Sequence, residues 1–323
     1  MPTKDRNIIL VFLFIILFAS PLFSHDEYVR FVLNSVAINI ILVMALNFVL
    51  GFAGQVFLGT VAFFAVGCYA TALLTTKLGF TFWQALPPTI VITALLAFLL
   101  GLPTLKVSGF YLALMSTGFI VVVGDVLKNW TQLTNGVWGV SGIPRPNLFG
   151  HTITTNIGFY YFAIIIAALL AVLAILVEDS RFGRAFKVVR DDELAGEVVG
   201  IHALKTKLLA FVMCGVYTGI AGSLFASFQQ FVSPEIYTFE YNSLFMCMLV
   251  VGGLGSVPGS VLGASLLTVL TELLRFMREK YLTVYAVIIL VILIYQPGGL
   301  VMLLRNAYYA LFKNRQAIRD EGA

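Results

Sequence analysis

Apolar runs of about 20 residues recur along almost the whole of this chain, and a helix needs a run of that length to cross the hydrocarbon core of a bilayer. Of its 323 residues, 60% are hydrophobic and only 11% are charged, whereas soluble domains carry about 25% charged residues. One soluble core cannot bury so many apolar side chains. The sequence therefore predicts an all-α polytopic membrane protein, surrounded by lipid and without nucleic acid as a partner.

The apolar runs divide the chain into about ten predicted membrane segments. They run from Ile8 to Phe23, Val32 to Leu50, Val56 to Thr76, Pro88 to Leu105, Phe110 to Val126, Ile157 to Val177, Leu208 to Phe231, twice between Leu244 and Leu274, and from Tyr281 to Leu303. The region from Leu244 to Leu274 is divided because Gly252 to Gly259 holds four glycines and a proline, which oppose a continuous helix.

Basic residues determine the predicted orientation of these segments. Lys and Arg are frequent at the N-terminus, in and shortly after residues 180–201, and in a tail at residues 304–323. Because cytoplasmic loops carry the excess of Lys and Arg, we expect both termini and residues 180–201 to lie in the cytoplasm. Without the division of the region from Leu244 to Leu274, the cations of the tail would face outward, against this rule. We expect residues 1–323 to form a single transmembrane domain.

Residues 180–201 form the longest polar stretch of the chain, and their pattern predicts two short helices. The first helix carries cations at three-residue spacing on one broad side, with Phe186 and Val189 facing another way. These cations are Arg181, Arg184, Lys187 and Arg190. The second helix places apolar residues at helical spacing before Gly200. They are Leu194, Ala195, Val198 and Val199. Such a pair can dock into a groove of a partner; the alternative is a solvated loop that only sets topology.

Two glycine-rich stretches resemble each other and suggest two related halves of the chain. Val49 to Gly59 reads V-L-G-F-A-G-Q-V-F-L-G, and Val250 to Gly259 reads V-V-G-G-L-G-S-V-P-G. Helices interrupted at both places would mark a substrate path, because exposed backbone groups at membrane depth are tolerated only beside a cavity or inside protein. The other interpretation is that the glycines permit close helix packing. The predicted path residues are Gly51, Gly54, Gln55, Val56 and Gly59 in the first stretch and Gly252, Gly255, Ser256, Val257 and Gly259 in the second.

The sequence contains no pattern typical of catalysis or metal binding. Cys68, Cys214 and Cys247 lie in apolar runs with no close pair, and the histidines form no cluster with carboxylates. No Ser, His and acid arrangement stands out, and there is no G-x-x-x-x-G-K-[ST] phosphate loop. We expect no enzyme activity, no metal and no cofactor bound by this chain.

A series of motifs follows in order along most of the chain. They are A-L-N-F-V-L-G-F-A-G-Q-V-F-L-G at Ala45 to Gly59, L-P-T-L-K-V-S-G-F-Y-L-A-L at Leu102 to Leu114, T-N-G-V-W-G-V-S-G-I-P at Thr134 to Pro144, G-R-A-F-K-V-V-R-D-D-E-L-A-G-E-V-V-G-I at Gly183 to Ile201, and V-V-G-G-L-G-S-V-P-G-S-V-L-G-A at Val250 to Ala264. In this order they resemble signatures of the LIV-type branched-chain amino acid permeases of ATP-binding cassette importers. Asn135 departs from the glycine expected there, and Lys106 from the common arginine.

This resemblance implies a permease that imports leucine, isoleucine and valine across the bacterial inner membrane. Such a permease works with a sister permease subunit, two ATP-binding subunits that use ATP, and an extracytoplasmic substrate-binding protein. Residues 180–201 would be the coupling loop that receives the motion of the ATPase. Gly183 would then allow a close turn, and Arg184 and Arg190 would pair with acidic groups of the partner while the apolar side fills its groove.

Two alternatives stay open from the sequence. Relatives with similar permeases carry urea, short amides and other amino acids, so the solute is not fixed by the resemblance. A secondary transporter driven by an ion gradient is the other possibility, with Asp125 or Glu272 as the coupling carboxylate.

Overall fold

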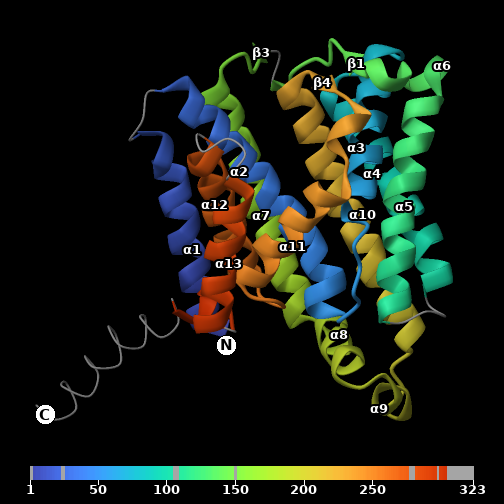
Figure 1. Ribbon diagram of the computed structural model, residues 1–323, viewed down its shortest axis with the longest axis vertical. Coiled ribbons are helices and arrows are strands. Elements are labelled where there is room, and N and C mark those ends of the chain that lie inside the picture. Colours follow the sequence, from blue (N-terminus) through green and yellow to red (C-terminus); the bar gives the residue numbers. More distant parts are fainter. Residues whose placement is uncertain are drawn as a thin grey trace, which may run out of the picture.

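The computed structural model describes residues 3–22, 26–104, 109–148, 151–275, 281–296 and 298–303. The predicted tail at residues 304–323, the segment ends Phe23 and Leu105, and Lys106 lie outside these residues. The longer helices are α1 (Thr3–Ala19), α2 (Glu27–Leu46), α3 (Thr60–Thr76), α4 (Phe82–Thr104), α5 (Phe110–Asn129), α7 (Asn156–Asp179), α10 (Ala203–Gln229), α11 (Phe239–Gly252), α12 (Val257–Leu274) and α13 (Tyr281–Tyr295). They form one bundle (Figure 1).

Shorter elements lie mainly at the two ends of the bundle (Figure 1). The helical ones are α6 (Thr131–Thr134), α8 (Arg181–Asp191), α9 (Glu193–Val198), the 3-10 turns η1 (Ser20–Leu22), η3 (Gly136–Trp138) and η4 (Pro234–Ile236), and the π-helix η2 (Asn47–Phe52). The strands are β1 (Val140–Ser141), β2 (Asn147–Leu148), β3 (His151–Thr152) and β4 (Phe231–Val232). β1 pairs antiparallel with β4, and β2 with β3, at the end of the bundle opposite α8.

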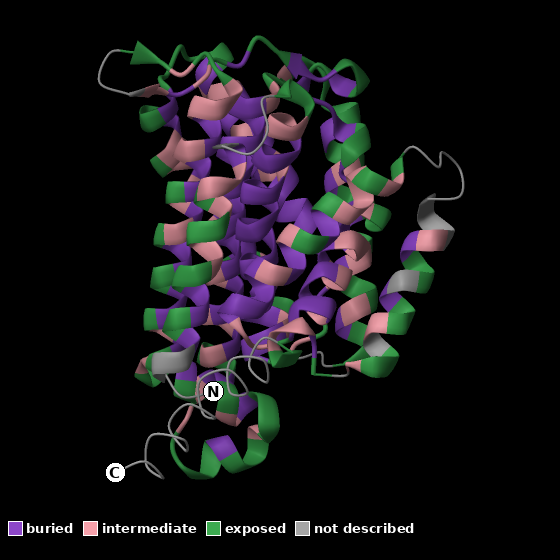
Figure 2. Ribbon diagram, turned by 90° about the vertical axis from the view of Figure 1, so that its left-hand side faces the viewer, coloured by how far each residue is buried: buried purple, intermediate pink, exposed green. Residues whose placement is uncertain are grey.

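The described helices confirm an all-α membrane protein with several spans. Six of them are long and apolar enough to cross a bilayer. Figure 2 shows buried residues concentrated in the middle of the bundle and exposed residues on its flanks. Many exposed side chains are large and apolar, such as Val91, Val122 and Leu176, which is the pattern of helices that face lipid rather than water.

Helix starts and ends follow local sequence signals. Ser180 caps α8 by accepting a hydrogen bond from the backbone N–H of Phe182 at 3.1 Å, and Asp192 caps α9 through the N–H of Leu194 at 2.9 Å. The region from Leu244 to Leu274 is divided as predicted, into α11 and α12. The predicted segment from Val56 to Thr76 begins too early: α3 starts at Thr60, because Gly54, at φ +68°, leads into a stretch without helix.

The same order of elements occurs twice, in opposite directions. After α2 and η2 come an irregular stretch (54–59), α3 and the longer α4. After α10 come an irregular stretch (230–238) that contains β4 and η4, then α11 and the longer α12. α2 packs against α11 and α12, whereas α10 packs against α3 and α4, so the two halves interlock. This correspondence pairs the break after α2 with the break after α10. The sequence similarity instead pairs the break after α2 with the turn between α11 and α12.

Helices α3 and α11 begin in contact with each other. Helix α11, at about 1.5 Å per residue, is roughly 21 Å long, less than the roughly 30 Å of a bilayer core. The backbone N–H of Val61, at the start of α3, donates to Oδ1 of Asn242 in the first turn of α11 at 3.2 Å. In the stretch before α3, the N–H of Leu58 donates to the buried Ser116 hydroxyl at 2.9 Å. These two hydrogen bonds pair backbone N–H groups beside the first break with protein side chains, as the interior of a membrane requires.

Candidate functional site

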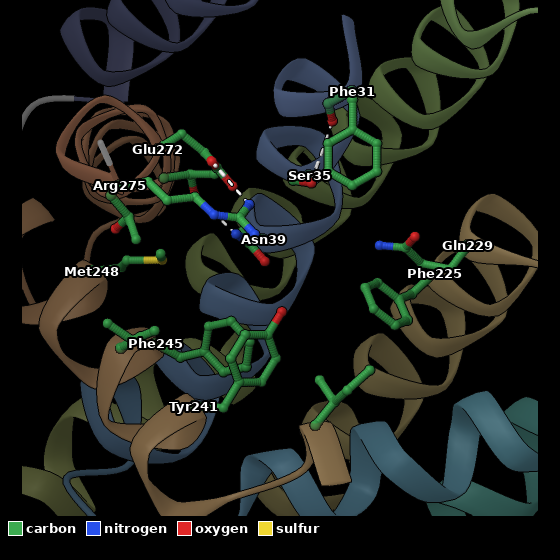
Figure 3. Close-up of a pocket in the computed structure, with 14 residues that line it drawn as sticks. Phe31, Ser35, Asn39, Phe225, Gln229, Tyr241, Phe245, Met248, Glu272 and Arg275 are labelled. Carbon is green, nitrogen blue, oxygen red and sulfur yellow. Dashed lines mark hydrogen bonds and ion pairs between the residues drawn. The ribbon is translucent and has the colours of Figure 1, made fainter. Parts of the chain in front are cut away.

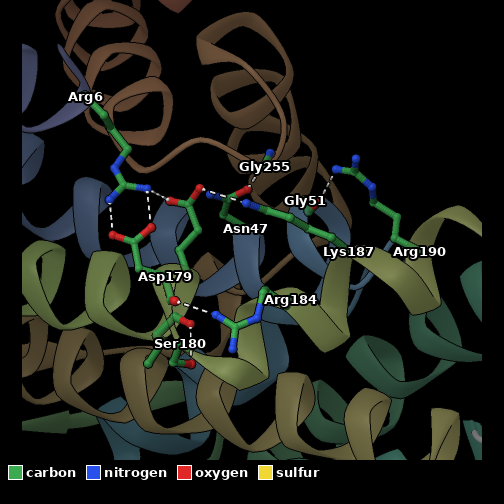
Figure 4. A network of polar contacts seen from close by, with 11 residues as sticks. Arg6, Asn47, Gly51, Asp179, Ser180, Arg184, Lys187, Arg190 and Gly255 are labelled. Atoms are coloured by element: carbon green, nitrogen blue, oxygen red, sulfur yellow. Dashed lines mark hydrogen bonds and ion pairs between the residues drawn. The ribbon is translucent and has the colours of Figure 1, made fainter. Parts of the chain in front are cut away.

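The two glycine-rich stretches meet at the α8 end of the bundle, in a contact that we call the glycine junction. It consists of Asn47, Gly51, Arg190 and Gly255, which Figure 4 shows, and of Gly54, which lies beside Arg190. Oδ1 of Asn47, in the π-helix η2, accepts a hydrogen bond of 2.9 Å from the backbone N–H of Gly255. A Cβ on Gly51 would lie 2.6 Å from the nitrogen of Gly255 and 1.8 Å from Oδ1 of Asn47. Glycine at position 51 therefore permits the close approach of η2 to the turn between α11 and α12.

Arg190 connects α8 to both glycine-rich stretches. Its Nη1 donates a hydrogen bond of 3.0 Å to the carbonyl oxygen of Gly51. Gly54 has a φ of +68°, and a Cβ there would lie 2.4 Å from Cγ of Arg190. A Cβ on Gly255 would lie 3.1 Å from Nη1 of the same arginine. A displacement of α8 would therefore act on both stretches through one side chain.

The other predicted path residues of the second stretch have packing and capping roles. The Ser256 hydroxyl caps α12 by accepting from the N–H of Gly259 at 3.3 Å. A Cβ on Gly252 would lie 2.1 Å from the carbonyl oxygen of Gly259, so the backbones of α11 and α12 touch here. Val257 is buried beside them. This part of the stretch packs two helices together, the second of the two interpretations that the sequence allowed.

The remaining residues of the first stretch lie between η2 and α3. Nε2 of Gln55 donates to the carbonyl oxygen of Ala53 at 3.3 Å, and Val56 is 38% exposed. Gly59 precedes α3, where a Cβ would lie 2.6 Å from Cζ of Phe57. Of these two predicted path residues, Val56 has an exposed apolar surface and Gly59 is enclosed.

Helix α8 packs its apolar side onto the bundle. Phe186 and Val189 are buried, as the helical spacing predicted. Gly183 is buried too, and a Cβ there would lie 2.0 Å from the carbonyl oxygen of Glu178. The tight corner between α7 and α8 thus requires a residue without a side chain.

The cations of α8 contact neighbouring residues of the same chain. Nη1 of Arg184 donates to the carbonyl oxygen of Asp179 at 3.3 Å, and Nζ of Lys187 lies 3.4 Å from Oε1 of Glu178. Arg181 lies over the ring of Phe182, with 5.3 Å between Cζ and the ring centroid. The sequence assigned Arg190 to a partner's acidic groups and gave no sign that it reaches the glycine junction, 139 residues away from Gly51.

Helix α9 presents an apolar surface away from the bundle. The exposed fractions are 75% for Leu194, 87% for Val198 and 70% for Val199. Nζ of Lys207, in α10, lies 2.5 Å from Oε2 of Glu193 and holds the start of α9 in place. Neighbouring exposed aliphatic residues on a short helix are typical of a surface that binds another protein.

The start of α1 lies beside the α7–α8 corner. Nη1 of Arg6 is 3.2 Å from Oε2 of Glu178, and its other terminal nitrogen binds Asp179 (Figure 4). Arg6 and Glu178 are both buried. A buried ion pair is lost at a high free-energy cost when one partner is removed, so these contacts fix the chain's first helix to the α8 end.

A cavity of about 430 Å³ lies between α2, α10, α11 and α12 (Figure 3). Gln229, the last residue of α10, and Arg275, just after α12, line it, so it reaches the end of the bundle opposite α8. Deeper, Nδ2 of Asn39 donates to Oγ1 of Thr268 at 2.9 Å. The sequence analysis did not identify this cavity. Asn39, a polar residue within an apolar run, was the available signal.

Among the described residues, no group of three or more His, Cys, Asp or Glu side chains is placed to hold a metal ion. Cys68 and Cys214 are buried and unpaired, and Cys247 is partly buried. The chemistry of the sites described above is therefore that of backbone groups, amides, hydroxyls and ion pairs.

A family model described as the permease component of a branched-chain amino acid transport system matches residues 28–295. The chain belongs to this family. The match confirms the resemblance carried by the motifs, and it covers both interlocked halves. The family match and the apolar helices together identify the permease as a multi-pass inner-membrane protein.

Curated relatives agree with this assignment. The permease is 36% identical over 291 residues to the high-affinity branched-chain amino acid transport system permease protein LivM of Salmonella typhimurium, covering 83% of this chain and 68% of the relative. The LivM protein of Escherichia coli gives the same identity and coverage. The LivH permease protein of Escherichia coli is 30% identical over 185 residues, covering 53% of this chain and 59% of LivH. No solved structure matches the permease.

Proposed function

We propose that this permease is the transmembrane subunit of an ATP-binding cassette importer that carries leucine, isoleucine and valine into the bacterial cytoplasm. The observation that carries the proposal is the similarity to LivM over most of both chains. The interrupted backbone before α3 and before α11 suits a transporter, because such breaks supply polar groups beside a path at membrane depth.

ATP hydrolysis takes place on partner subunits in this proposal, because the sequence contains no phosphate-binding loop of the G-x-x-x-x-G-K-[ST] kind. The importer has two such subunits, and one of them binds at residues 180–201 of this chain, where the exposed apolar surface of α9 enters its groove. A sister permease subunit and an extracytoplasmic binding protein complete the importer. The permease itself is one domain, residues 1–323, and binds neither ATP nor another cofactor.

The glycine junction transmits the motion of the ATPase. When α8 moves with its partner, Arg190 pulls on the carbonyl oxygen of Gly51, and Asn47 carries the displacement to Gly255. The ends of α2, α11 and α12 then shift at the cytoplasmic end of the substrate path. Val56 and the polar side chain of Gln55 lie next to this moving region and line the path there.

The proposed topology has about ten crossings and both termini in the cytoplasm. Arg6 supports it, because its ion pairs with Glu178 and Asp179 hold the start of α1 at the α8 end. The tail at residues 304–323 follows the last crossing and lies on the same side in this arrangement.

Uptake by the complete importer in proteoliposomes tests the function. With the binding protein and ATP present, leucine, isoleucine and valine should accumulate, and an uncoupler should leave the uptake intact. Urea or another amino acid in their place would show that the solute is wrong. Uptake that needs no ATP and stops with the uncoupler would instead identify an ion-coupled transporter, with Asp125 or Glu272 as the carboxylate to examine first.

Cysteine labelling in intact cells tests the orientation. In a Cys247→Ser background, an impermeant thiol reagent should label His151→Cys, which is exposed in β3, and should not label Glu197→Cys, which is exposed in α9. The two positions lie at opposite ends of the bundle, so each serves as the control for the other. Labelling of Glu197→Cys alone would show that the orientation is the reverse.

A further inference from the structure

The cavity between α2, α10, α11 and α12 lies where the two interlocked halves meet, because α2 begins one half and α10 begins the other. Its volume, about 430 Å³, falls near the lower end of the range of small-molecule sites, about 300–1,000 Å³. It is therefore large enough for one small molecule and too small for a peptide chain of several residues.

The end of the cavity farthest from α8 is charged. Oε2 of Glu272 accepts a hydrogen bond from the hydroxyl of Tyr28 at 2.6 Å and lies 3.4 Å from Nη1 of Arg275. The Arg275 side chain is 70% exposed, and that of Glu272 is 21% exposed. A long, partly solvated ion pair contributes little free energy, about 0–1 kcal/mol. A ligand can therefore replace it easily.

The deeper part of the cavity is mainly apolar. Leu244, Phe245 and Met248 follow one face of α11, and Phe225 of α10 lies across from them (Figure 3). Phe245 and Met248 are buried. The Asn39–Thr268 pair adds one amide and one hydroxyl to this wall. The lining thus combines a positive and a negative group at one end with an aliphatic and aromatic surface at the other.

We propose that this cavity receives the imported amino acid after it leaves the binding protein, and that it recognises a zwitterion with an aliphatic side chain. The Glu272 carboxylate binds the α-ammonium group, the Arg275 guanidinium binds the α-carboxylate, and the side chain lies against Phe245 and Met248. This inference rests on the proposed function, and it places the entry of the path at the end opposite the glycine junction. Weak binding suits this role, because the amino acid must continue toward the cytoplasm.

An aromatic ring placed in the cavity should block the path. Thr271 lines the cavity, and its hydroxyl donates to the carbonyl oxygen of Leu267 within α12. Thr271→Phe should lower ATP-dependent leucine uptake roughly tenfold or more, by the steric exclusion that gives enzyme pockets their selectivity. Leu273→Phe is the matched control, since Leu273 is 63% exposed on the same helix; its uptake should stay near the unmodified rate. Equal uptake by the two assembled variants would overturn the inference.

Protection from labelling tests occupancy without relying on transport. In a Cys247→Ser background, millimolar L-leucine should slow the reaction of Thr271→Cys with a small methanethiosulfonate reagent, and should not affect Leu273→Cys. Leucine amide, which lacks the carboxylate, and 4-methylpentanoate, which lacks the ammonium group, should protect much less. Equal protection by all three would exclude zwitterion recognition. Labelling that leucine does not affect but delipidation speeds up would identify a lipid chain as the occupant and overturn the inference.

Uptake by the unmodified importer separates this inference from the proposed function. If the unmodified importer takes up no leucine, isoleucine or valine, the proposed function is wrong. If it takes them up while Thr271→Phe matches Leu273→Phe and leucine gives no protection, only the assignment of the cavity is wrong.

Discussion

Leucine in place of Gly54 is expected to lower amino-acid uptake strongly, whereas leucine in place of Gly79 should leave it close to the unmodified rate. Both glycines have a φ of +68°, so a side chain at either position costs about 1–2 kcal/mol of backbone strain. At Gly79 there is nothing within 4 Å of an added Cβ, but at Gly54 it would lie 2.4 Å from Cγ of Arg190. The backbone penalty is matched, and only the collision with α8 differs.

The collision should separate α8 from the glycine junction. Overpacking costs about 1–3 kcal/mol, and every 1.4 kcal/mol corresponds to about a factor of ten, so uptake should fall by roughly fivefold to a hundredfold. The measurement is ATP-dependent leucine uptake in proteoliposomes, with the ATPase content of the purified complex determined in parallel. The same low uptake in both variants would mean that backbone strain, and not contact with α8, is responsible.

Helices with a local sequence signal could be predicted from the chain alone. Ser180 and Asp192 are good N-cap residues, so α8 and α9 appear where the polar stretch predicted them. The glycines and proline of Gly252 to Gly259 correctly divide α11 from α12. These signals are local, because capping and helix breaking depend on neighbouring residues.

The break between α10 and α11 could not be predicted from the sequence, for a physical reason. The predicted segments leave residues 232–243 as a connection between Phe231 and Leu244, yet α11 already begins at Phe239, and its first turn contacts the start of α3. This contact joins Asn242 and Val61, which are 181 positions apart. Hydropathy detects the length of an apolar run but not the depth at which a helix begins, so α3 and α11 could not be recognised as a related pair.

The cavity and the glycine junction also depend on contacts between distant residues. Asn39 and Thr268 are 229 positions apart, and Asn47 and Gly255 are 208 apart. The sequence identified both glycine-rich stretches as special, and the structure brings Gly51 and Gly255 together. The contact of Arg190 with Gly51 could not be predicted from the sequence. A cation on an amphipathic helix is usually solvated, and its spacing does not reveal an inward contact.

Replacing Arg190 with leucine is expected to separate transport from ATPase binding. The lost hydrogen bond, from a charged donor to the Gly51 carbonyl oxygen, is worth about 1.5–3 kcal/mol, so uptake should fall roughly tenfold to a hundredfold. The exposed α9 residues Leu194 and Val198 are unchanged, so the ATPase subunits should stay bound and hydrolyse ATP. Leucine uptake, ATPase activity and subunit content of the same purified complex provide the test.

Two further variants serve as controls for Arg190→Leu. Lys205→Leu removes an exposed cation at the start of α10 and should preserve both uptake and assembly, which excludes a general effect of lost positive charge. Val198→Asp places a charge in the apolar surface of α9 and should release the ATPase subunits, because an unpaired charge in an interface core is costly to desolvate. If Arg190→Leu also released them, Arg190 would bind the partner directly, as its position in the basic pattern first indicated, and the glycine junction would receive the motion of the ATPase by another route.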